Sequence, residues 1–163
     1  MYNIEIKVKG YGTMKAQLDP TYAPITVENF VSLIKKGFYD GLTFHRIISG
    51  FMIQGGSPNG DGTGRLKESI KGEFLANGVN NPLSHTRGAL SMARPMDPNG
   101  ASCQFFIVHK DSKYLDGQYA VFGYVTEGMD VVDAICFDTR VLDGNGTVAR
   151  SDQPVIEEIK IVD

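Results

Sequence analysis

The chain has 163 residues, of which 16 are basic and 19 acidic, so its formal net charge is −3 at pH 7. This length suits one domain with one hydrophobic core, which we assign to residues 1–163. The sequence contains no basic cluster of the kind that binds nucleic acid. It also contains no apolar run near the roughly 20 residues needed to cross a bilayer. We therefore expect neither a nucleic-acid partner nor a membrane partner.

The N-terminus and the cysteines bear on location. Residues 1–7 alternate like a strand and lack the charged and apolar regions of a signal peptide. Cys103 and Cys136 are too few for a disulfide framework. These features predict a cytoplasmic, reducing environment. A monomer is the default expectation.

The two ends of the chain are predicted to form strands. Apolar and polar residues alternate from Ile4 to Val8 and again over residues 14–18, on either side of glycines 10 and 12. This alternation predicts a hairpin over residues 3–18. The tail, residues 155–162, has the same character and is expected to pair with the first strand.

Two amphipathic helices are expected. Apolar residues at 27, 30, 31 and 34 have the i, i+3, i+4, i+7 spacing of a helix face. Thr26 or a neighbour could cap this helix, and Gly37 could end it. A second short helix is expected over residues 128–137.

The middle of the chain combines short strands with loops. Residues 42–54 predict a strand that carries Arg46, and residues 55–87, rich in glycine, are expected to be irregular. Short apolar strands are then predicted at 89–93, 104–108 and 120–125. Several short strands with two helices predict an antiparallel barrel.

Arg46 is the most informative residue of the chain, because it lies in a segment that otherwise has the pattern of a buried strand. Arginine is rarely buried unless it is paired. Arg46 must therefore either have a carboxylate partner or open onto a cleft. Phe51, Met52 and Gln54 follow closely and offer an apolar wall and one neutral polar group. This mixture suits an apolar, uncharged ligand rich in carbonyl groups.

Three glycine- or asparagine-containing segments have simpler interpretations than the motifs they resemble. Residues 60–64 lack the Gly-Lys-Ser/Thr of a phosphate loop, which favours an ordinary surface loop. Asn145-Gly146-Thr147 matches a glycosylation acceptor but also a tight turn, and we favour the turn. Residues 97–100 likewise predict a turn and not a calcium loop.

The histidines and cysteines do not suggest a metal or a cofactor. His45, His85 and His109 lie far apart in the sequence, without the spacing of a zinc site. His45 adjoins Arg46, so strand alternation predicts that it faces the other way, as a hydrogen-bonded structural histidine. Cys103 could be a nucleophile assisted by His109, but a small buried cysteine is the favoured interpretation.

The aromatic residues of one strand pose a question that the pattern leaves open. Phe105 and Phe106 must point to opposite faces, so that one fills the barrel and the other needs a cover or a ligand. The same question applies to the loop 114–119, which carries two tyrosines and a leucine.

Together these segments resemble the cyclophilin family of peptidyl-prolyl cis–trans isomerases. The resemblance runs from about residue 4 to residue 162. It implies a closed eight-stranded antiparallel barrel capped by two α-helices, with the ligand groove on the outside. The matching segments are Thr26–Phe30, Phe44–Ile48, Gly50–Met52, Gln54–Gly56, Gly88–Ala93, Gln104–Ile107, Leu115–Gly117 and Val121–Gly123.

The resemblance also implies roles for individual residues. Arg46 would be the catalytic arginine, and Gln54 would orient it and touch the substrate backbone. The remaining family positions would hold the substrate. The proline ring would contact Phe51, Met52, Phe106 and Leu115, and the adjoining backbone would contact Ala93, Arg94 and Gln104.

Three positions depart from the best-known eukaryotic pattern of this family. Arg94 stands where asparagine is usual, which places a charge at the edge of the groove. Tyr114 replaces a tryptophan whose indole N–H bonds cyclosporin, so weaker binding of that drug is expected. Tyr119 replaces a histidine on the pocket wall, which bears on sequence preference.

The implied activity is acceleration of rotation about X–Pro peptide bonds, with proline-containing peptides and folding proteins as partners. Rotation needs no nucleophile or metal, only stabilisation of the twisted amide, and a guanidinium that remains charged can supply it. Two other classes stay open at this point. One is a non-catalytic proline-peptide binding or chaperone module, and the other is a cysteine-dependent hydrolase built on Cys103.

Overall fold

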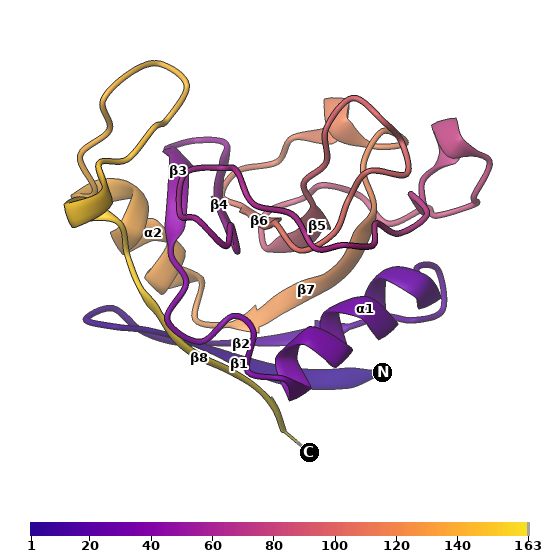
Figure 1. The fold of residues 1–163 in the computed structure, drawn as a ribbon, viewed down its shortest axis with the longest axis horizontal. Coiled ribbons are helices and arrows are strands. Elements are labelled where there is room, and N and C mark those ends of the chain that lie inside the picture. The colour runs from indigo at the N-terminus through magenta and orange to yellow at the C-terminus, as the bar shows by residue number, and fades with distance from the viewer. Residues whose placement is uncertain (163) are drawn as a thin grey trace.

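The computed structural model describes residues 1–162, which form eight β-strands and two α-helices (Figure 1). Three short 3₁₀ turns lie in the long loops. The strands and helices in chain order are β1 (Tyr2–Val8), β2 (Gly12–Leu18), α1 (Pro24–Lys35), β3 (Phe44–Ile48), β4 (Met52–Gly55), β5 (Ala89–Met92), β6 (Phe105–Val108), β7 (Val121–Glu127), α2 (Met129–Asp138) and β8 (Ile156–Val162).

All paired strands are antiparallel and form one sheet in the order β3-β4-β6-β5-β7-β2-β1-β8. The outer strands β3 and β8 approach each other at an isolated bridge between Thr43 and Val155. The Phe44 N–H also donates to the Pro154 carbonyl at 3.0 Å. The expected eight-stranded antiparallel fold is confirmed. The predicted closure is not complete, because β3 and β8 meet in this short contact instead of a full ladder.

The predicted hairpin and tail pairing are confirmed, because β1 pairs with β2 on one side and β8 on the other. The prediction of a single strand over residues 42–54 is wrong. This segment is a hairpin of β3 and β4, which pair with each other. Gly50 has a φ of +82°, a conformation that glycine adopts without strain, and it turns the chain between the two strands.

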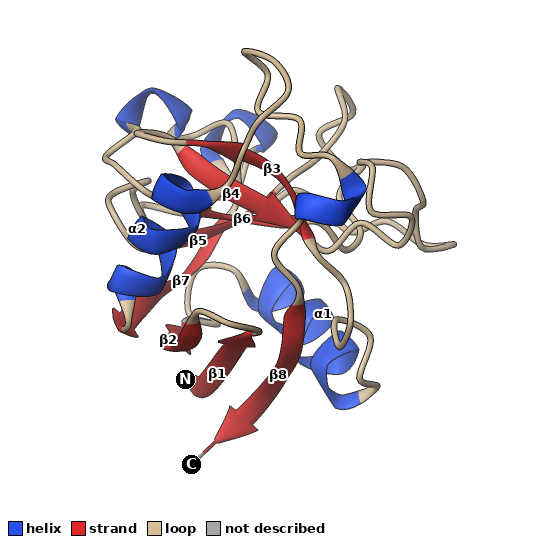
Figure 2. Ribbon diagram, turned by 90° about the vertical axis from the view of Figure 1, so that its left-hand side faces the viewer, coloured by secondary structure: helices blue, strands red, loops and turns tan. Residues whose placement is uncertain are grey.

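Both predicted helices are present, at well-separated places around the sheet (Figures 1 and 2). Thr26 is not the residue that caps α1, because Ala23 precedes the helix and Thr26 lies inside its first turn. The Thr26 N–H and hydroxyl both donate to the Glu73 carboxylate, at 2.6 and 2.7 Å. A distant loop therefore supplies the acceptor at this helix start. Gly37, with a φ of +69°, follows the last turn as expected.

The strands bury side chains on both of their faces. Inside the barrel, the largest aromatic group joins the ring of Phe105 to those of Phe30, Tyr39 and Phe44. A second cluster lies on the outer face of β4 to β7 and includes Phe106. The structure thus answers the question left open by the sequence: Phe105 fills the barrel, and Phe106 faces outward under the loops.

Replacing Phe105 by alanine should destabilise the fold by about 3–5 kcal/mol, because it leaves a cavity among packed rings. Urea denaturation would measure this loss. Phe137→Ala is the matched control: the Phe137 side chain is 90% exposed, so its removal should change stability by no more than about 0.5 kcal/mol. Equal losses in the two variants would contradict this description of the core.

Candidate active site

The candidate site begins as a row of side chains across four neighbouring strands. Arg46 of β3 pairs with Gln54 of β4, which pairs with Phe106 of β6, which pairs with Ser91 of β5. Residues in register on adjacent strands point to the same face of a sheet. The row therefore places a guanidinium, an amide and an aromatic ring side by side on the outside of the barrel.

An open cavity of about 170 Å³ lies over this row. Its wall brings together nine of the eleven site residues expected from the sequence. These are Arg46, Phe51, Met52, Gln54, Ala93, Arg94, Phe106, Leu115 and Tyr119. We call this space the apolar cavity, because six of its nine lining residues are aromatic or aliphatic. Arg46 stands at its edge, since it also lines a neighbouring cavity.

The two remaining expected residues lie beside the apolar cavity and do not line it. Gln104 borders two neighbouring cavities instead. Tyr114 is 72% exposed, and its ring centroid lies 6.0 Å from that of Phe51. Tyr114 therefore extends the aromatic surface beyond the cavity mouth.

Arg46 is held by uncharged groups. Its Nε donates to the Asn145 carbonyl at 2.8 Å, its Nη2 to the Asn145 side-chain oxygen at 3.2 Å, and its Nη1 to Gln54 Oε1 at 3.2 Å. Among residues 1–162, no carboxylate forms an ion pair with Arg46. Of the two alternatives raised by the sequence, the structure selects the arginine that opens onto a cleft.

Asn145 is a contact residue that sequence reasoning missed. The prediction of a turn at residues 145–147 is confirmed, since Gly146 has a φ of +81° and its N–H donates to the Asp143 carbonyl. The Asn-Gly pair signals the turn but says nothing about its partner. The contact joins residues 99 positions apart in the sequence, and only the folded barrel brings them together.

A chain of hydrogen bonds fixes the orientation of two glutamine amides. Gln54 accepts from Arg46 and donates to Gln104 Oε1 at 3.0 Å, and Gln104 donates to the Gly62 carbonyl at 2.9 Å. The guanidinium can only donate and the carbonyl can only accept, so both amides have one possible orientation. The loop 60–64, expected to be an ordinary surface loop, thus anchors one end of this chain.

His45 departs from both expectations made for it. A β-bulge interrupts the pairing between Phe44 and Arg46. As a result, His45 and Arg46 do not face opposite ways, and both line a cavity beside the apolar cavity that is also bordered by Asn145 and residues 59–62. The prediction of a hydrogen-bonded histidine is also wrong, because the buried His45 Nδ1 has no partner. Burial and the nearby Arg46 charge lower the pKa of His45, which favours the neutral ring.

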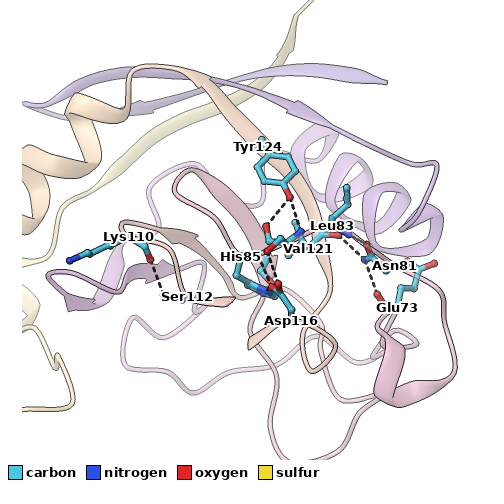
Figure 3. Close-up of polar contacts among 11 residues, drawn as sticks. Glu73, Asn81, Leu83, His85, Lys110, Ser112, Asp116, Val121 and Tyr124 are labelled. Carbon is cyan, nitrogen blue, oxygen red and sulfur yellow. Dashed lines mark hydrogen bonds and ion pairs between the residues drawn. The ribbon is translucent and has the colours of Figure 1, made fainter. Parts of the chain in front are cut away.

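A polar network that includes His85 and Asp116 (Figure 3) contacts the wall of the apolar cavity through the Phe106 ring. His85 is fully buried and stacks on the Phe106 ring, with centroids 5.9 Å apart. Asp116 accepts from the His85 backbone N–H at 2.7 Å and contacts His85 Nδ1 at 2.8 Å, while Nε2 lies 2.9 Å from the Ser91 hydroxyl. An ionised carboxylate can only accept, which assigns the proton to Nδ1. Asp116 directly follows Leu115, so the network fixes that wall of the cavity.

The positive charge of Arg94 is packed between aromatic rings. Its guanidinium carbon lies 4.9 Å from the ring centroid of Phe74 and 4.8 Å from that of Tyr119. Its Nε and Nη2 donate to the Gln118 carbonyl at 3.1 and 2.7 Å. Arg94 and Tyr119, two of the positions that depart from the eukaryotic pattern, are therefore in direct contact with each other.

Cys103 is unsuited to nucleophilic chemistry. Its side chain belongs to the barrel core, and burial raises the pKa of its thiol. His109 contacts other groups: its Nδ1 accepts from the Gly50 N–H at 2.8 Å, and its Nε2 lies 3.0 Å from the Asp133 carboxylate. His109 thus steadies the turn that precedes Phe51. The three histidines therefore occupy separate environments.

Comparison with known proteins agrees with this geometry. A family model described as "Cyclophilin type peptidyl-prolyl cis-trans isomerase/CLD" matches residues 3–163. Peptidyl-prolyl cis-trans isomerase B of Bacillus subtilis (strain 168) is 51% identical over 114 residues, which cover 70% of this chain and 76% of that protein. A peptidyl-prolyl cis-trans isomerase of Helicobacter pylori (strain ATCC 700392 / 26695) is 46% identical over 126 residues, covering 76% and 74% of the two chains.

A solved structure has the same fold. The crystal structure of a Cryptosporidium parvum cyclophilin type peptidyl-prolyl cis-trans isomerase, in the presence of the dipeptide Ala-Pro, superposes with a TM-score of 0.86 and 30% identity over 99% of both chains. The fold and its outward-facing site define a cyclophilin barrel. The chain belongs to the cyclophilin-type peptidyl-prolyl cis–trans isomerase family.

The free energy of unfolding should fall as the pH drops from 7 to 5, because two histidines resist protonation in the folded protein. Burial lowers the pKa of His85, and burial together with Arg46 lowers that of His45. Below about pH 6.5 the unfolded chain binds protons that the native state excludes, so stability is lost. Urea midpoints at pH 7, 6 and 5 would measure the fall.

His45→Gln should make that fall smaller, since it removes one of the two groups. Aspartates with lowered pKa values, such as Asp116 and Asp133, contribute only nearer pH 4 and do not enter this window. An identical fall in the wild type and the variant would mean that His45 is freely protonated in the folded state.

Proposed function

We propose that this chain accelerates cis–trans exchange of X–Pro bonds by donating a hydrogen bond from Arg46 to the twisted amide. The observation that carries the proposal is the position of Arg46. It stands at the edge of the apolar cavity, held by Asn145 and Gln54 and by no carboxylate among the described residues. Its charge is therefore available to a ligand.

The chemistry follows from the electronic structure of the amide. Resonance gives the peptide bond a rotation barrier of roughly 18–20 kcal/mol. When the bond twists, the proline nitrogen regains a lone pair and becomes a hydrogen-bond acceptor. A donor aimed at that nitrogen stabilises the twisted state more than either planar isomer, which lowers the barrier. Arginine suits this role, because it remains charged at ordinary pH.

The other residues would hold the substrate so that only one part of it turns. The apolar wall is suited to grip the proline ring through Phe51, Met52, Phe106 and Leu115, with Tyr119 closing one side. Gln54 orients Arg46, and Gln104 in turn orients Gln54. Ala93 and Arg94 border both the apolar cavity and its neighbour, where the substrate backbone would continue.

The substrate class is supported by the chemistry of the site and by the dipeptide named for the C. parvum cyclophilin. We propose proline-containing peptides and folding proteins as partners. Within the described residues, no helix is long and apolar enough to cross a bilayer. The free thiols of Cys103 and Cys136 support the proposal of a reducing, cytoplasmic location. A monomer remains our proposal for the assembly state.

Two alternative functions are less well supported. A cysteine-dependent hydrolase needs an accessible thiolate, whereas Cys103 is buried with a raised pKa. A pure proline-binding module would use the same apolar cavity but would not need a donor at its edge. Removing the Arg46 guanidinium therefore distinguishes a binding module from a catalyst.

Arg46→Ala should lower the catalysed exchange rate by about 100-fold or more while the peptide still binds, because it removes the donor and leaves the apolar wall. Exchange of an Ala-Pro-containing peptide, followed by NMR, would measure the rate, and chemical-shift titration would measure binding. Arg140→Ala is the matched control, since Arg140 is exposed and lies outside the cavity. A folded Arg46→Ala variant with unchanged rate would reject the mechanism.

Tyr114→Trp should strengthen inhibition by cyclosporin by roughly 10-fold, the effect of one added hydrogen bond from the indole N–H. Tyr114 is exposed beside Phe51, and its one side-chain donor is the hydroxyl at the far end of the ring instead of a ring N–H. An inhibition titration of both proteins would measure the change. Equal inhibition of the wild type and the variant would show that residue 114 does not limit drug binding here.

A further inference from the structure

A second cavity adjoins the apolar cavity and has a different chemical character. It has a volume of about 230 Å³, and it shares Gln54, Ala93 and Arg94 with the apolar cavity. Arg65 and Gly100 also line it, and neither of them lines the apolar cavity. We call this space the two-arginine cavity. A peptide whose proline occupied the apolar cavity would pass this opening within a few residues, since an extended chain advances about 3.3–3.6 Å per residue.

The two guanidinium groups of this cavity are bonded only to carbonyl oxygens. Arg65 Nη2 donates to the Gly100 carbonyl at 2.7 Å. Arg94 donates to the carbonyls of Gln118, Pro95 and Met96. A carbonyl accepts a hydrogen bond without cancelling the positive charge. Among residues 1–162, neither arginine forms an ion pair with a carboxylate.

Three acidic groups lie within four residues of these arginines along the chain. Glu68, nearest to Arg65, neither forms an ion pair with it nor lines the cavity. Asp61 accepts from the N–H of Thr63 within its own loop, and Asp97 accepts from the N–H of Asn99 within its turn. The side chains of Asp61 and Asp97 also do not line the two-arginine cavity. The cavity therefore carries an uncompensated positive charge, although the whole chain has a net charge of −3.

The two arginines differ in how many of their donors are used within the protein. Arg94 is fixed by its carbonyl partners and by the rings of Phe74 and Tyr119. Arg65 is exposed and uses only its Nη2 in a bond within the protein, so Nε and Nη1 remain available. A carboxylate is the group that a guanidinium fork binds best, through two parallel N–H···O bonds.

We propose that the two-arginine cavity makes this isomerase selective for substrates with an acidic side chain close to the proline, with Arg65 as the residue that binds the carboxylate. The proposal rests on the proposed function, because it assumes that proline occupies the apolar cavity. Arg65 does not line that cavity. Its role is to select the substrate, whereas Arg46 acts on the amide.

The test compares peptides that differ at one position. One set carries Glu, Ala or Lys two residues before the proline, and a second set carries them two residues after it. Catalysed exchange measured by NMR should be about 5-fold faster, as kcat/KM, for Glu than for Ala in one of the two sets. The advantage should shrink between 0.05 and 0.5 M NaCl, as salt screens an exposed ion pair.

Arg65→Gln should abolish the preference for Glu without changing the rate on the alanine peptide, and Arg65→Glu should transfer the preference to Lys. Arg65→Lys keeps the charge and should retain part of the preference. Equal rates for Glu and Ala in both sets, or a Glu preference that survives Arg65→Gln, would overturn the proposal. Failure of the proposed function itself would be recognised separately, because then no peptide would be accelerated by the wild type.

Discussion

The pairing of β4 between β3 and β6 is the constraint on which both the core and the candidate site depend. This register aligns Arg46, Gln54 and Phe106 in one row on the outer face. The same register directs Phe105 into the barrel. A slip of one residue would exchange the two faces and expel an aromatic ring from the core. The stability of the barrel and the geometry of the site therefore rest on the same hydrogen-bonded ladder.

The polar groups of the site are arranged so that its central charge is oriented but not neutralised. Asn145 and Gln54 bind Arg46 through oxygen atoms that bear no formal charge, and Gln104 in turn orients Gln54. A carboxylate in the same place would orient the guanidinium equally well, but it would weaken the field that an uncharged amide experiences. The buried His45, kept neutral beside Arg46, adds no competing charge. The same pattern of carbonyl partners recurs at Arg65 and Arg94.

The sequence predicted the features that depend on local periodicity. The hairpin of β1 and β2, the face of α1, and the set of residues around the apolar cavity were all accessible from spacing or from the family resemblance. It could not predict which of Phe105 and Phe106 faces inward, because both faces of β6 are buried. It also could not predict the contact of Asn145 with Arg46, or the cap that Glu73 provides for α1. Those contacts depend on segments that are brought together only in the folded protein.

The bulge at His45 also determines how this site could be moved to another protein. It adds one residue to β3, so that two successive side chains open outward before the strand resumes its alternation. A graft of Arg46 and Gln54 onto two regular strands would keep their pairing but would change the twist that aims the guanidinium. The smallest transferable unit is therefore the hairpin from Phe44 to Gly55 with its extra residue, together with the turn of Asn145 that holds the guanidinium. The receiving barrel must also have a neighbouring strand that can pair with β4.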